Sequence, residues 1–542
     1  MEIKKFESIS PVEKEKAPFV WAGANVYFLI TDRFCNGKTD NDVNFERNLD
    51  TGSLRNFLGG DLKGITRKIK EGYFNDLGVN AIWFTPIVEQ IHGTVDEGSG
   101  NTYGYHGYWA KDWSAIDPNF GTEADLEELV TVAHNHGIRL LMDVVINHTG
   151  PITEKDPVWP QDWVRTGPVC SYNNYENTTD CTLVANLPDV RTESNEDVEL
   201  PDFLKEKWQN EGRLEQELKE LDAFFERTGY PRSPKHHIVK WLTDYVREFG
   251  IDGFRVDTVK HVDEDVWAIL RAEANYAFDQ WKTQHPDKVL DDNDFFMVGE
   301  VYGYRISDGQ WYDFGDKKVN YFDYGFNALI NFQFKLDANG DYESIFSKND
   351  FHLHHDLQGY TTMNYTSSHD DGDPFDRNRE RPFNAATKLL LAPGVSQIYY
   401  GDETARSLWV DGAQGDANLR SFMNWGDVSG NPLIKNLFRH YSRLGQFRAK
   451  HPAVGAGAHK MLSASPYFFS RTYTTDDYTD TVLIGIDVPE GEKSFFVGNT
   501  FPDDTLLLEF YSHIPVVVKH KRIKFTTPHT VVLLAKEKPE NI

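Results

Sequence analysis

Short apolar runs alternate with longer amphipathic stretches through the middle of this 542-residue chain. Residues 81–86 (AIWFTP) have the pattern of a buried strand, residues 125–136 place apolar side chains at helical spacing, and residues 139–145 (RLLMDVV) form the next apolar run. A continuous apolar run is typical of a strand in a parallel sheet, because helices cover both faces of such a sheet. The alternation therefore predicts parallel strands that are joined by helices.

The same strand-then-helix unit can be followed eight times along the chain. The other six candidate strands are residues 25–30, 253–256, 296–299, 321–324, 361–364 and 397–400. Each of the eight is followed by a plausible helix. Eight such units predict an α/β fold in which the strands close into a (β/α)8 TIM barrel.

Two segments do not fit this unit. The gap between residues 145 and 253 is too long for one helix and two loops. We therefore expect an inserted domain B at 150–231, after strand 3, with a charged helical part at 201–227. The catalytic barrel is then expected in two parts, 1–149 and 232–450.

The pattern changes again after about residue 451. Short strands are predicted there at residues 467–472, 481–487, 493–498, 505–509 and 530–534. Short strands at this spacing are typical of an antiparallel β-sandwich, which we expect as a C-terminal domain C at 451–542.

The charge balance restricts the partners of the chain. Lys and Arg number 56 and Asp and Glu number 84, which gives a net charge of −28. A field of this sign repels phosphate groups, so nucleic acid and anionic membranes are not expected as partners. No apolar run approaches the ~20 residues of a membrane span, so none is expected.

The cysteines and the first residues bear on location. The chain has three cysteines, and their spacing is not that of a zinc site. Cys170 and Cys181 are close enough in sequence to form a disulfide that closes a loop. The sequence is compatible with this disulfide and with two free thiols. The charged start, MEIKKF, has no apolar signal core. We favour a secreted or periplasmic protein whose signal is absent from this sequence, with a cytoplasmic protein as the alternative.

Titratable side chains stand at the ends of four of the predicted strands. In a TIM barrel the catalytic groups lie at the carboxyl ends of the strands, where the loops meet. A single Asp at such a place is more often a cap or an ion-pair partner. Four such segments in order, on strands three, four, five and seven, are hard to obtain by chance. They are Asp143–His148 (DVVINH), Gly253–His261 (GFRVDTVKH), Phe296–Glu300 (FMVGE) and Tyr365–Asp370 (YTSSHD).

These four segments resemble the ordered signature regions of glycoside hydrolase family 13, the α-amylase family. GFRVDTVKH is close to the most specific of them, and the resemblance covers barrel, insertion and C-terminal part. Further family-like segments are Tyr105–Trp109, Leu187–Val190, Gly59–Gly64 and Tyr399–Glu403. One position departs from the family pattern: Ser368 stands where Asn commonly precedes His-Asp. That Asn is a chloride ligand in chloride-activated members, so the resemblance does not extend to chloride activation.

The resemblance implies roles for three carboxylates. Retaining glycoside hydrolysis uses a nucleophile and a protonatable carboxyl about 5–5.5 Å apart. Asp257 would be the nucleophile, Glu300 the general acid and then base, and Asp370 the third carboxylate, which binds sugar hydroxyls and helps distort the ring. Arg255 lies on the same strand face as Asp257, and its permanent charge would hold Asp257 ionised. Carboxylates near Glu300 would raise its pKa.

The resemblance also implies substrate contacts. Tyr108 would stack under the sugar at the cleavage site, because a phenol ring offers a flat apolar face and a polar tip. His106, His148 and His369 would hydrogen-bond that sugar. Lys260 and His261 resemble residues on the leaving-group side. Without these motifs, each histidine would be interpreted as an ordinary core or surface residue.

Two calcium sites are suggested by the resemblance. The first, where the insertion meets the barrel, would use Asn147, Asp189 and the backbone carbonyl of His261, which are hard oxygen ligands that suit Ca²⁺ better than zinc. The second is the acidic loop at 32–42. Lys38 stands there where an oxygen ligand would be expected, and a solvated acidic turn without a metal stays open as the alternative. Its candidate ligands are Asn36, Asn41, Asp42 and Asp61.

The leading hypothesis is an α-amylase that hydrolyses internal α-1,4-glucosidic bonds of starch, glycogen or maltodextrins with retention, and acts as a monomer. A neutral glucan is a substrate that an acidic surface does not repel. One alternative is a cyclodextrin glucanotransferase-like enzyme, whose chains usually carry further domains. Leu187-Pro188-Asp189 resembles the amylase form of its region more than the α-1,6 or sucrose-type forms. A non-catalytic glucan-binding relative would lack the carboxylates that are present here.

Overall fold

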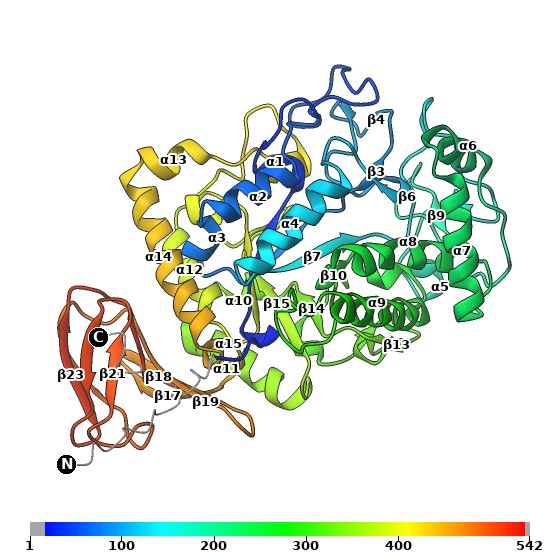
Figure 1. Ribbon diagram of the computed structural model, residues 1–542. Coiled ribbons are helices and arrows are strands. Elements are labelled where there is room, and N and C mark those ends of the chain that lie inside the picture. Colours follow the sequence, from blue (N-terminus) through cyan, green and yellow to red (C-terminus); the bar gives the residue numbers. More distant parts are fainter. Residues whose placement is uncertain (1–16, 537–542) are drawn as a thin grey trace, which may run out of the picture.

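The computed structural model describes residues 17–536 and is built around a closed barrel of eight parallel strands (Figure 1). Strands that follow one another in the sequence are also neighbours in space, and the last closes onto the first. In this order they are β1 (Asn25–Leu29), β2 (Ala81–Phe84), β7 (Arg139–Val144), β10 (Gly253–Val256), β11 (Phe296–Gly299), β14 (Ala328–Asn331), β15 (Thr361–Tyr365) and β16 (Val395–Tyr399). Every residue of these strands is buried. The predicted TIM barrel is confirmed.

The prediction of the sixth strand was wrong. Tyr321–Tyr324 forms the 3-10 helix η4, and the barrel strand β14 begins only at Ala328. The side chain of Asn320 accepts a hydrogen bond from the Phe322 amide and so starts a turn, which ends at Gly325 with a φ of 105°. The aromatic side chains of η4 are buried against the neighbouring helix α9 (Glu264–Gln284), which explains why the segment looks like a strand in the sequence.

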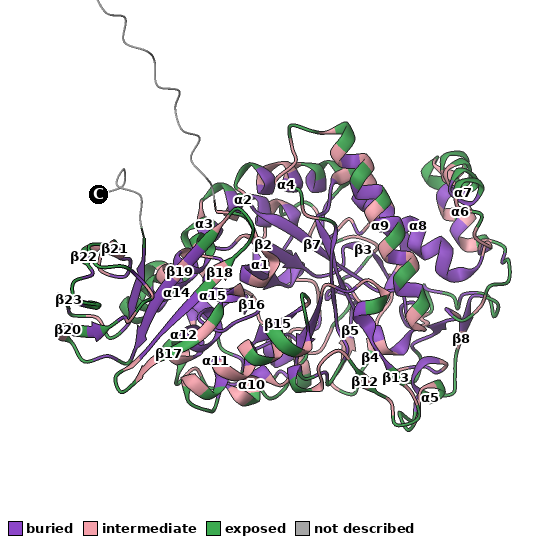
Figure 2. Cartoon of the chain, turned by 90° about the horizontal axis from the view of Figure 1, so that it is seen from below, coloured by how far each residue is buried: buried purple, intermediate pink, exposed green. Residues whose placement is uncertain are grey.

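Helices surround the barrel, and their outer faces are exposed (Figure 2). The predicted helix at 125–136 is α4 (Glu123–Asn135), which begins with a capping box in which Thr122 and Asp125 satisfy each other's backbone amides. The other helices of eight or more residues in this part are α2 (Leu62–Lys70), α8 (Pro234–Phe249), α9, α11 (Tyr342–Phe351), α12 (Pro382–Leu390) and α14 (Pro432–Lys450). Shorter ones are α1 (Thr31–Phe34), α3 (Tyr73–Asp76), α10 (Phe334–Asp337), α13 (Trp425–Gly430) and α15 (Ala453–Ala456).

The long segment between β7 and α8 leaves the barrel and carries the predicted helical part. It contains β8 (Val164–Arg165), α5 (Glu176–Thr179), β9 (Asp189–Val190), α6 (Asp202–Glu211) and α7 (Leu214–Thr228). Cys170 and Cys181 form a disulfide around α5, whereas Cys35 is free and buried.

Helices α6 and α7 are held by Asp112 of β6 (Ala110–Ile116), a strand in the segment between the barrel strands β2 and β7. This buried carboxylate accepts hydrogen bonds from Lys207 at 2.8 Å and from Arg213 at 2.8 Å. Both cations hold its pKa below the ordinary value although burial acts in the other direction. The ion pairs therefore fix the insertion on the strand β6.

The C-terminal part forms antiparallel sheets beside α14 and α15, drawn in orange to red in Figure 1. Phe468 and Phe495, from the two sheets, stack at 4.1 Å in a core of their own. The expected β-sandwich is confirmed. One sheet has the order β17 (Ala458–Ala464), β18 (Tyr467–Thr474), β19 (Thr479–Ile486), β24 (Val532–Ala535), β21 (Leu506–Glu509) and β22 (Ile514–Val517), and the other pairs β20 (Gly491–Phe496) with β23 (Arg522–Thr527).

Three of these strands escaped prediction. β17 and β22 are the edge strands of the six-stranded sheet. β17 (Ala458–Ala464) lacks a continuous apolar run, whereas β22 (Ile514–Val517) is short. β22 also contains Pro515, which a central strand would not tolerate. β23 alternates exposed and buried residues with Lys and Arg on its outer face, so few of its residues are apolar.

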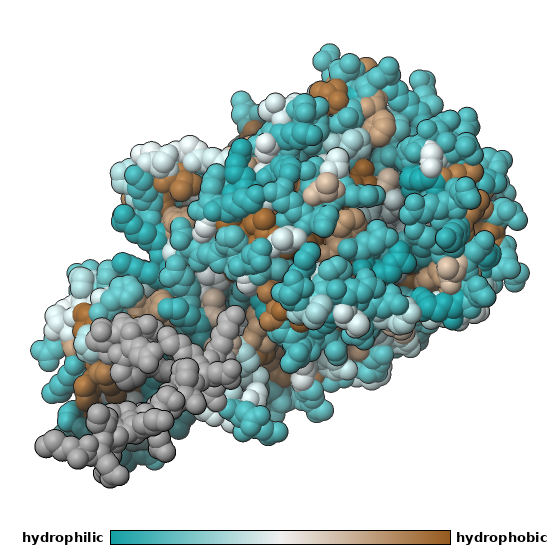
Figure 3. Space-filling view, in the orientation of Figure 1, coloured by the Kyte–Doolittle hydropathy of each residue, from teal (hydrophilic) through white to brown (hydrophobic). Residues whose placement is uncertain are grey.

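The visible face of the molecule is mainly hydrophilic, with scattered apolar side chains (Figure 3). Within residues 17–536, no helix combines the length and the apolar character that crossing a bilayer requires.

Candidate active site

Asp257 and Glu300 directly follow the neighbouring strands β10 and β11 and meet on one guanidinium group. Arg255 Nη1 donates to Asp257 Oδ1 at 2.6 Å, and its Nη2 lies 3.2 Å from Glu300 Oε2. The two strands pair in register, with Val256 opposite Gly299, so each carboxylate leaves the barrel at the same height. The strand-end argument from the sequence therefore placed these two groups together correctly.

Asp143 is a third carboxylate on the same guanidinium, and it was not among the predicted site residues. Arg255 Nη1 also donates to Asp143 Oδ1 at 3.0 Å. Trp83 Nε1 and the Tyr108 hydroxyl donate to Asp143 Oδ2 at 3.0 and 2.8 Å. Burial and the negative charge of Asp257 raise the pKa of Asp143, whereas the positive charge of Arg255 lowers it. The net result is a pKa of about 7. The signal was present, because Asp143 opens the segment DVVINH.

Glu300 is in an environment that favours its protonated form. Burial raises its pKa well above the ordinary value; Arg255 opposes this, while the charges of Asp257 and Asp370 add to it. The backbone amide of Thr258 donates to Glu300 Oε2 at 3.0 Å. Thr258 has a φ of 50°, unusual for a residue other than glycine, and the turn that it makes after β10 directs this amide toward Glu300.

Asp370 lies on the loop after β15 and opens to solvent, unlike the other two predicted carboxylates. Its side chain is 34% exposed, compared with 10% for Asp257 and 8% for Glu300. The hydroxyl of Ser368, the residue that departs from the family pattern, donates to Asp370 Oδ1 at 3.3 Å. The three carboxylates thus form a site with two buried members and one at its entrance.

Tyr108 contacts two histidines. Its ring stacks on His106 at 5.7 Å and on His369 at 5.4 Å. His106 Nδ1 accepts a hydrogen bond from the Tyr108 amide at 3.1 Å, so the proton of the neutral imidazole is on Nε2. Burial, reinforced by Arg420, lowers the pKa of both histidines, and each is neutral. Neutral imidazole N–H groups are suitable donors to sugar hydroxyls.

Arg420 is a further residue that the sequence did not indicate. Its Nε donates to the His369 carbonyl at 2.9 Å, and its Nη2 pairs with Asp416 at 2.8 Å. It therefore fixes the loop that carries Asp370. No motif contains it, because it reaches the site from a distant loop after β16.

Lys260 and His261 occupy the 3-10 turn η2 (Val259–His261) after β10. Lys260 Nζ donates to the Tyr302 carbonyl at 3.1 Å and to the Tyr312 hydroxyl at 3.2 Å. The His261 ring is buried, and its Nδ1 lies 3.0 Å from the carbonyl of Thr178 in α5. Lys260 thus faces the loop after β11, whereas the side chain of His261 faces the insertion.

Three oxygens converge where the insertion meets the barrel. Asn147 Oδ1 lies 2.8 Å from the His261 carbonyl and 3.3 Å from Asp189 Oδ1. Asp189 is buried, and its other oxygen pairs with Arg165 Nε at 3.1 Å. These are the three oxygens that the resemblance implied as calcium ligands. Oxygens this close need a cation or a proton between them.

The hydrogen bonds of His148 decide the orientation of the Asn147 amide. His148 Nε2 faces the Tyr108 carbonyl at 3.1 Å and must carry a proton to donate to it. Burial lowers the pKa of His148, so its Nδ1 has no proton and accepts from Asn147 Nδ2 at 3.2 Å. The amide oxygen of Asn147 then faces the other two oxygens, as in a site for a hard cation.

The acidic loop at 32–42 fits a metal only in part. Asn36 Oδ1 and Asn41 Oδ1 are buried without a hydrogen-bond partner, as a metal site would require. Asp61, however, caps α2 by accepting from the Gly64 amide at 2.6 Å. Lys38 Nζ lies 3.4 Å from Asp40, and this side chain has no oxygen to offer at the position where a metal ligand would be expected.

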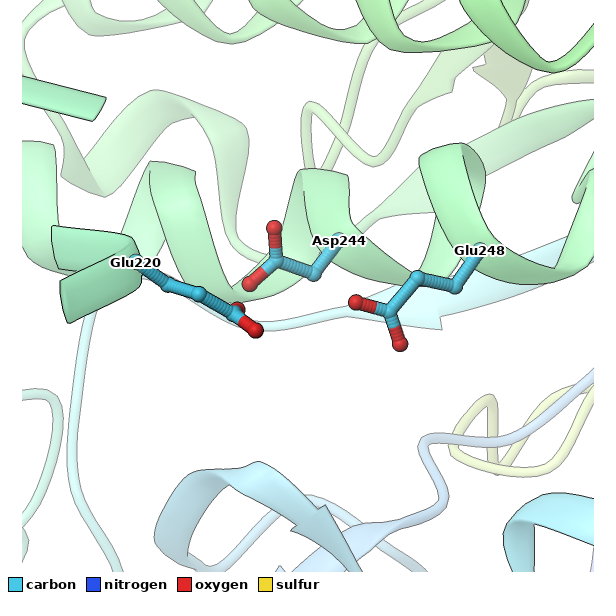
Figure 4. A group of neighbouring side chains, drawn as sticks. All are labelled: Glu220, Asp244 and Glu248. Atoms are coloured by element: carbon cyan, nitrogen blue, oxygen red, sulfur yellow. The ribbon is translucent and has the colours of Figure 1, made fainter. Parts of the chain in front are cut away.

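Another acidic group, formed by Glu220, Asp244 and Glu248, lies on α7 and α8, away from the strand ends (Figure 4). Its oxygens lie within 4.8 Å of one another. Lys240 Nζ pairs with Asp244 at 2.6 Å and with Glu220 at 3.1 Å, and Arg247 Nη2 pairs with Glu248 at 2.8 Å. These two cations balance most of the charge, so the cluster is explained without a metal ion.

Comparison with known proteins agrees with this geometry. The family model described as "Alpha amylase, catalytic domain" matches residues 28–428. The chain is 36% identical to the periplasmic alpha-amylase of Escherichia coli K12 over 521 residues, which cover 85% of this chain and 72% of that protein. The chain belongs to the α-amylase family. It is therefore a glycoside hydrolase.

Solved structures of amylase-family proteins share the fold. The crystal structure of an Anoxybacillus alpha-amylase is 24% identical, with a TM-score of 0.66 over 96% of this chain and 100% of that chain. The structure of CldA, described as a cyclomaltodextrin glucanotransferase with a three-domain ABC distribution, is 21% identical, with a TM-score of 0.64 over 95% of this chain and 99% of that chain. At these identities the likeness shows the fold alone.

Proposed function

We propose that this enzyme is an α-amylase that cleaves internal α-1,4-glucosidic bonds of starch, glycogen and maltodextrins and retains the anomeric configuration. The observation that carries the proposal is the pair Asp257 and Glu300 on the guanidinium of Arg255, with one carboxylate ion-paired and the other in an environment that favours protonation. The 36% identity to a periplasmic alpha-amylase supports the substrate class.

The two carboxylates would share the reaction as follows. Asp257, held by the bond from Arg255, attacks the anomeric carbon and forms a covalent glycosyl-enzyme. Glu300 donates its proton to the departing glycosidic oxygen, and the resulting carboxylate then removes a proton from the water that hydrolyses the intermediate. The raised pKa of Glu300 suits this role, because the first step needs a protonated acid.

The surrounding groups would bind the sugar at the cleavage site. Tyr108 would provide the stacking face, and the neutral imidazoles of His106 and His369 would donate to hydroxyls. Asp370, exposed at the entrance, would accept hydrogen bonds from the sugar as it distorts. His148, whose Nε2 is occupied by the Tyr108 carbonyl, would act mainly by positioning Tyr108.

Ca²⁺ fits the three convergent oxygens of Asn147, Asp189 and the His261 carbonyl. Since His261 belongs to the η2 turn after β10 and Asp189 belongs to the insertion, a cation there would hold the insertion against the barrel.

We also propose the domain limits 1–149 with 232–450, 150–231 and 451–542, and a monomer. The Cys170–Cys181 disulfide supports an oxidising, secreted or periplasmic location.

Transglycosylation is the second candidate. CldA, a cyclomaltodextrin glucanotransferase by its description, has a three-domain arrangement and shares this fold, so domain number does not separate the two activities. The same nucleophile and acid serve both, and the difference is whether water or a sugar hydroxyl accepts the glycosyl group.

The decisive measurement is a time course of products from soluble starch and from maltoheptaose. An α-amylase releases mixed linear maltooligosaccharides, with a rapid fall in starch chain length and products that first appear in the α-anomeric form. Cyclic or lengthened products would establish the transglycosylase instead. A protein that binds starch without any turnover would overturn both.

Asp257→Asn and Glu300→Gln are each expected to lower kcat by about 10³-fold or more, because each removes one partner of the double displacement. The near-identical shape of the amides should leave the far-UV circular dichroism unchanged. Glu248→Gln, at an acidic cluster away from the site, is the matched control and should keep its activity. Substantial activity in either site variant would refute these assignments.

Asp370→Asn is expected to shift the pH profile of the residual activity. The charge of Asp370 raises the pKa of Glu300, so its removal lowers that pKa. Glu300 then loses its proton at a lower pH, and the alkaline limb of kcat/KM moves to lower pH. An alkaline limb that stays in place would show that Glu300 is not the group that titrates there.

Calcium removal is expected to lower the melting temperature. EDTA should destabilise the wild type, and added Ca²⁺, but not Mg²⁺, should restore it, because only Ca²⁺ tolerates an irregular set of oxygen ligands. Asp189→Asn should lose most of this Ca²⁺ response, whereas Asp40→Asn, outside both ligand sets, should retain it. An equal melting temperature of the wild type with and without EDTA would argue against structural calcium.

A further inference from the structure

A hollow of about 960 Å³ lies in the loop that follows β11, beside the small hairpin of β12 (Tyr312–Asp313) and β13 (Lys318–Val319). Its volume is within the range of about 300–1,000 Å³ typical of ligand sites. Its lining includes Gly303, Arg305 and Trp311 together with residues of the hairpin. None of these residues belongs to the motifs that indicated the active site.

The chemistry of the lining suits a neutral polar ring. Trp311 lines the hollow and is 52% exposed, so an aromatic surface is accessible to a ligand there. Arg305 pairs with Asp308 at 2.8 Å, and Lys318 pairs with Asp313 at 3.2 Å. With each charge matched, the hollow has no surplus charge to select an ion. It offers instead an aromatic face with hydrogen-bond donors and acceptors around it, which is the combination that a sugar ring uses.

The hollow is connected to the catalytic centre through Lys260. Lys260 Nζ donates to the hydroxyl of Tyr312, which lines the hollow, and to the carbonyl next to Gly303. Burial lowers the pKa of Lys260, and the charge of Glu300 acts on the same ammonium group in the opposite direction. Glu300, as the general acid, must lie beside the departing oxygen. The hollow therefore continues from the leaving-group side of the site.

We propose that this hollow is a remote subsite that binds the leaving-group end of the glucan chain, with Trp311 as its stacking platform. The proposal rests on the proposed function above. A chain long enough to reach Trp311 gains binding energy at a distance from the bond that breaks. The enzyme then prefers long chains, and the hairpin helps set where it cuts them.

The test compares substrates of increasing length on Trp311→Ala. We expect the ratio of kcat/KM for maltooctaose to that for maltotriose to fall about tenfold, which corresponds to about 1.4 kcal/mol at one stacking contact. Trp311→Tyr keeps a ring and should restore most of the ratio. Phe496→Ala is the matched control: Phe496 is 53% exposed, and its strand β20 lies across the molecule from β12 and β13 (Figure 2). This control should keep the wild-type ratio.

Two outcomes would overturn the subsite: an unchanged ratio in Trp311→Ala, or an equal loss for maltotriose and maltooctaose. Calorimetry with maltooctaose on Glu300→Gln, with and without Trp311→Ala, provides a readout that does not depend on turnover, and equal affinities would also overturn it. If the wild type cleaves no α-1,4-glucan of any length, the proposed function fails. If the wild type cleaves these glucans and Trp311→Ala leaves the ratio of kcat/KM for maltooctaose to that for maltotriose unchanged, only the proposed subsite fails.

Discussion

One buried guanidinium holds the active centre together. Arg255 contacts Asp143, Asp257 and Glu300, three carboxylates that would repel one another without it. A single positive charge cannot keep three buried carboxylates ionised, because each charge removed from water carries a desolvation cost. The pKa values of Asp143 and Glu300 are raised as a result. The imbalance leaves a proton in the site, which is what an acid catalyst requires.

The barrel makes this arrangement possible. Parallel strands in register bring Asp143 opposite Arg255 on β7 and β10, and Gly299 opposite Val256 on β11 and β10. The carboxylates therefore leave the sheet at one rim, within reach of one side chain. Trp83, from β2, adds a further hydrogen bond to Asp143, so four successive strands contribute to the same cluster.

The insertion completes the site from outside the barrel. Its disulfide-closed loop carries Thr178, whose carbonyl meets the His261 ring, and its strand β9 carries Asp189 beside Asn147. These contacts fix the turn that follows Asp257. The loop after β11 does the same on the other side, where Tyr312 and the Tyr302 carbonyl hold Lys260. Both segments lie outside the barrel strands, where loops tolerate changes in length better than strands do.

The sequence alone determined the barrel, seven of its eight strands, and the strand ends that carry Asp257, Glu300 and Asp370. Local apolar runs encode buried strands, and a strand end is fixed by the strand before it. The sequence misplaced the sixth strand, because Tyr321 and Phe322 of η4 are buried in a 3-10 turn that packs on other segments of the chain and not in a sheet. Only the tertiary structure joined Asp143 to the guanidinium of Arg255 and brought Arg420 to the loop that carries Asp370. These contacts join segments that are distant in the sequence, and no local pattern records them.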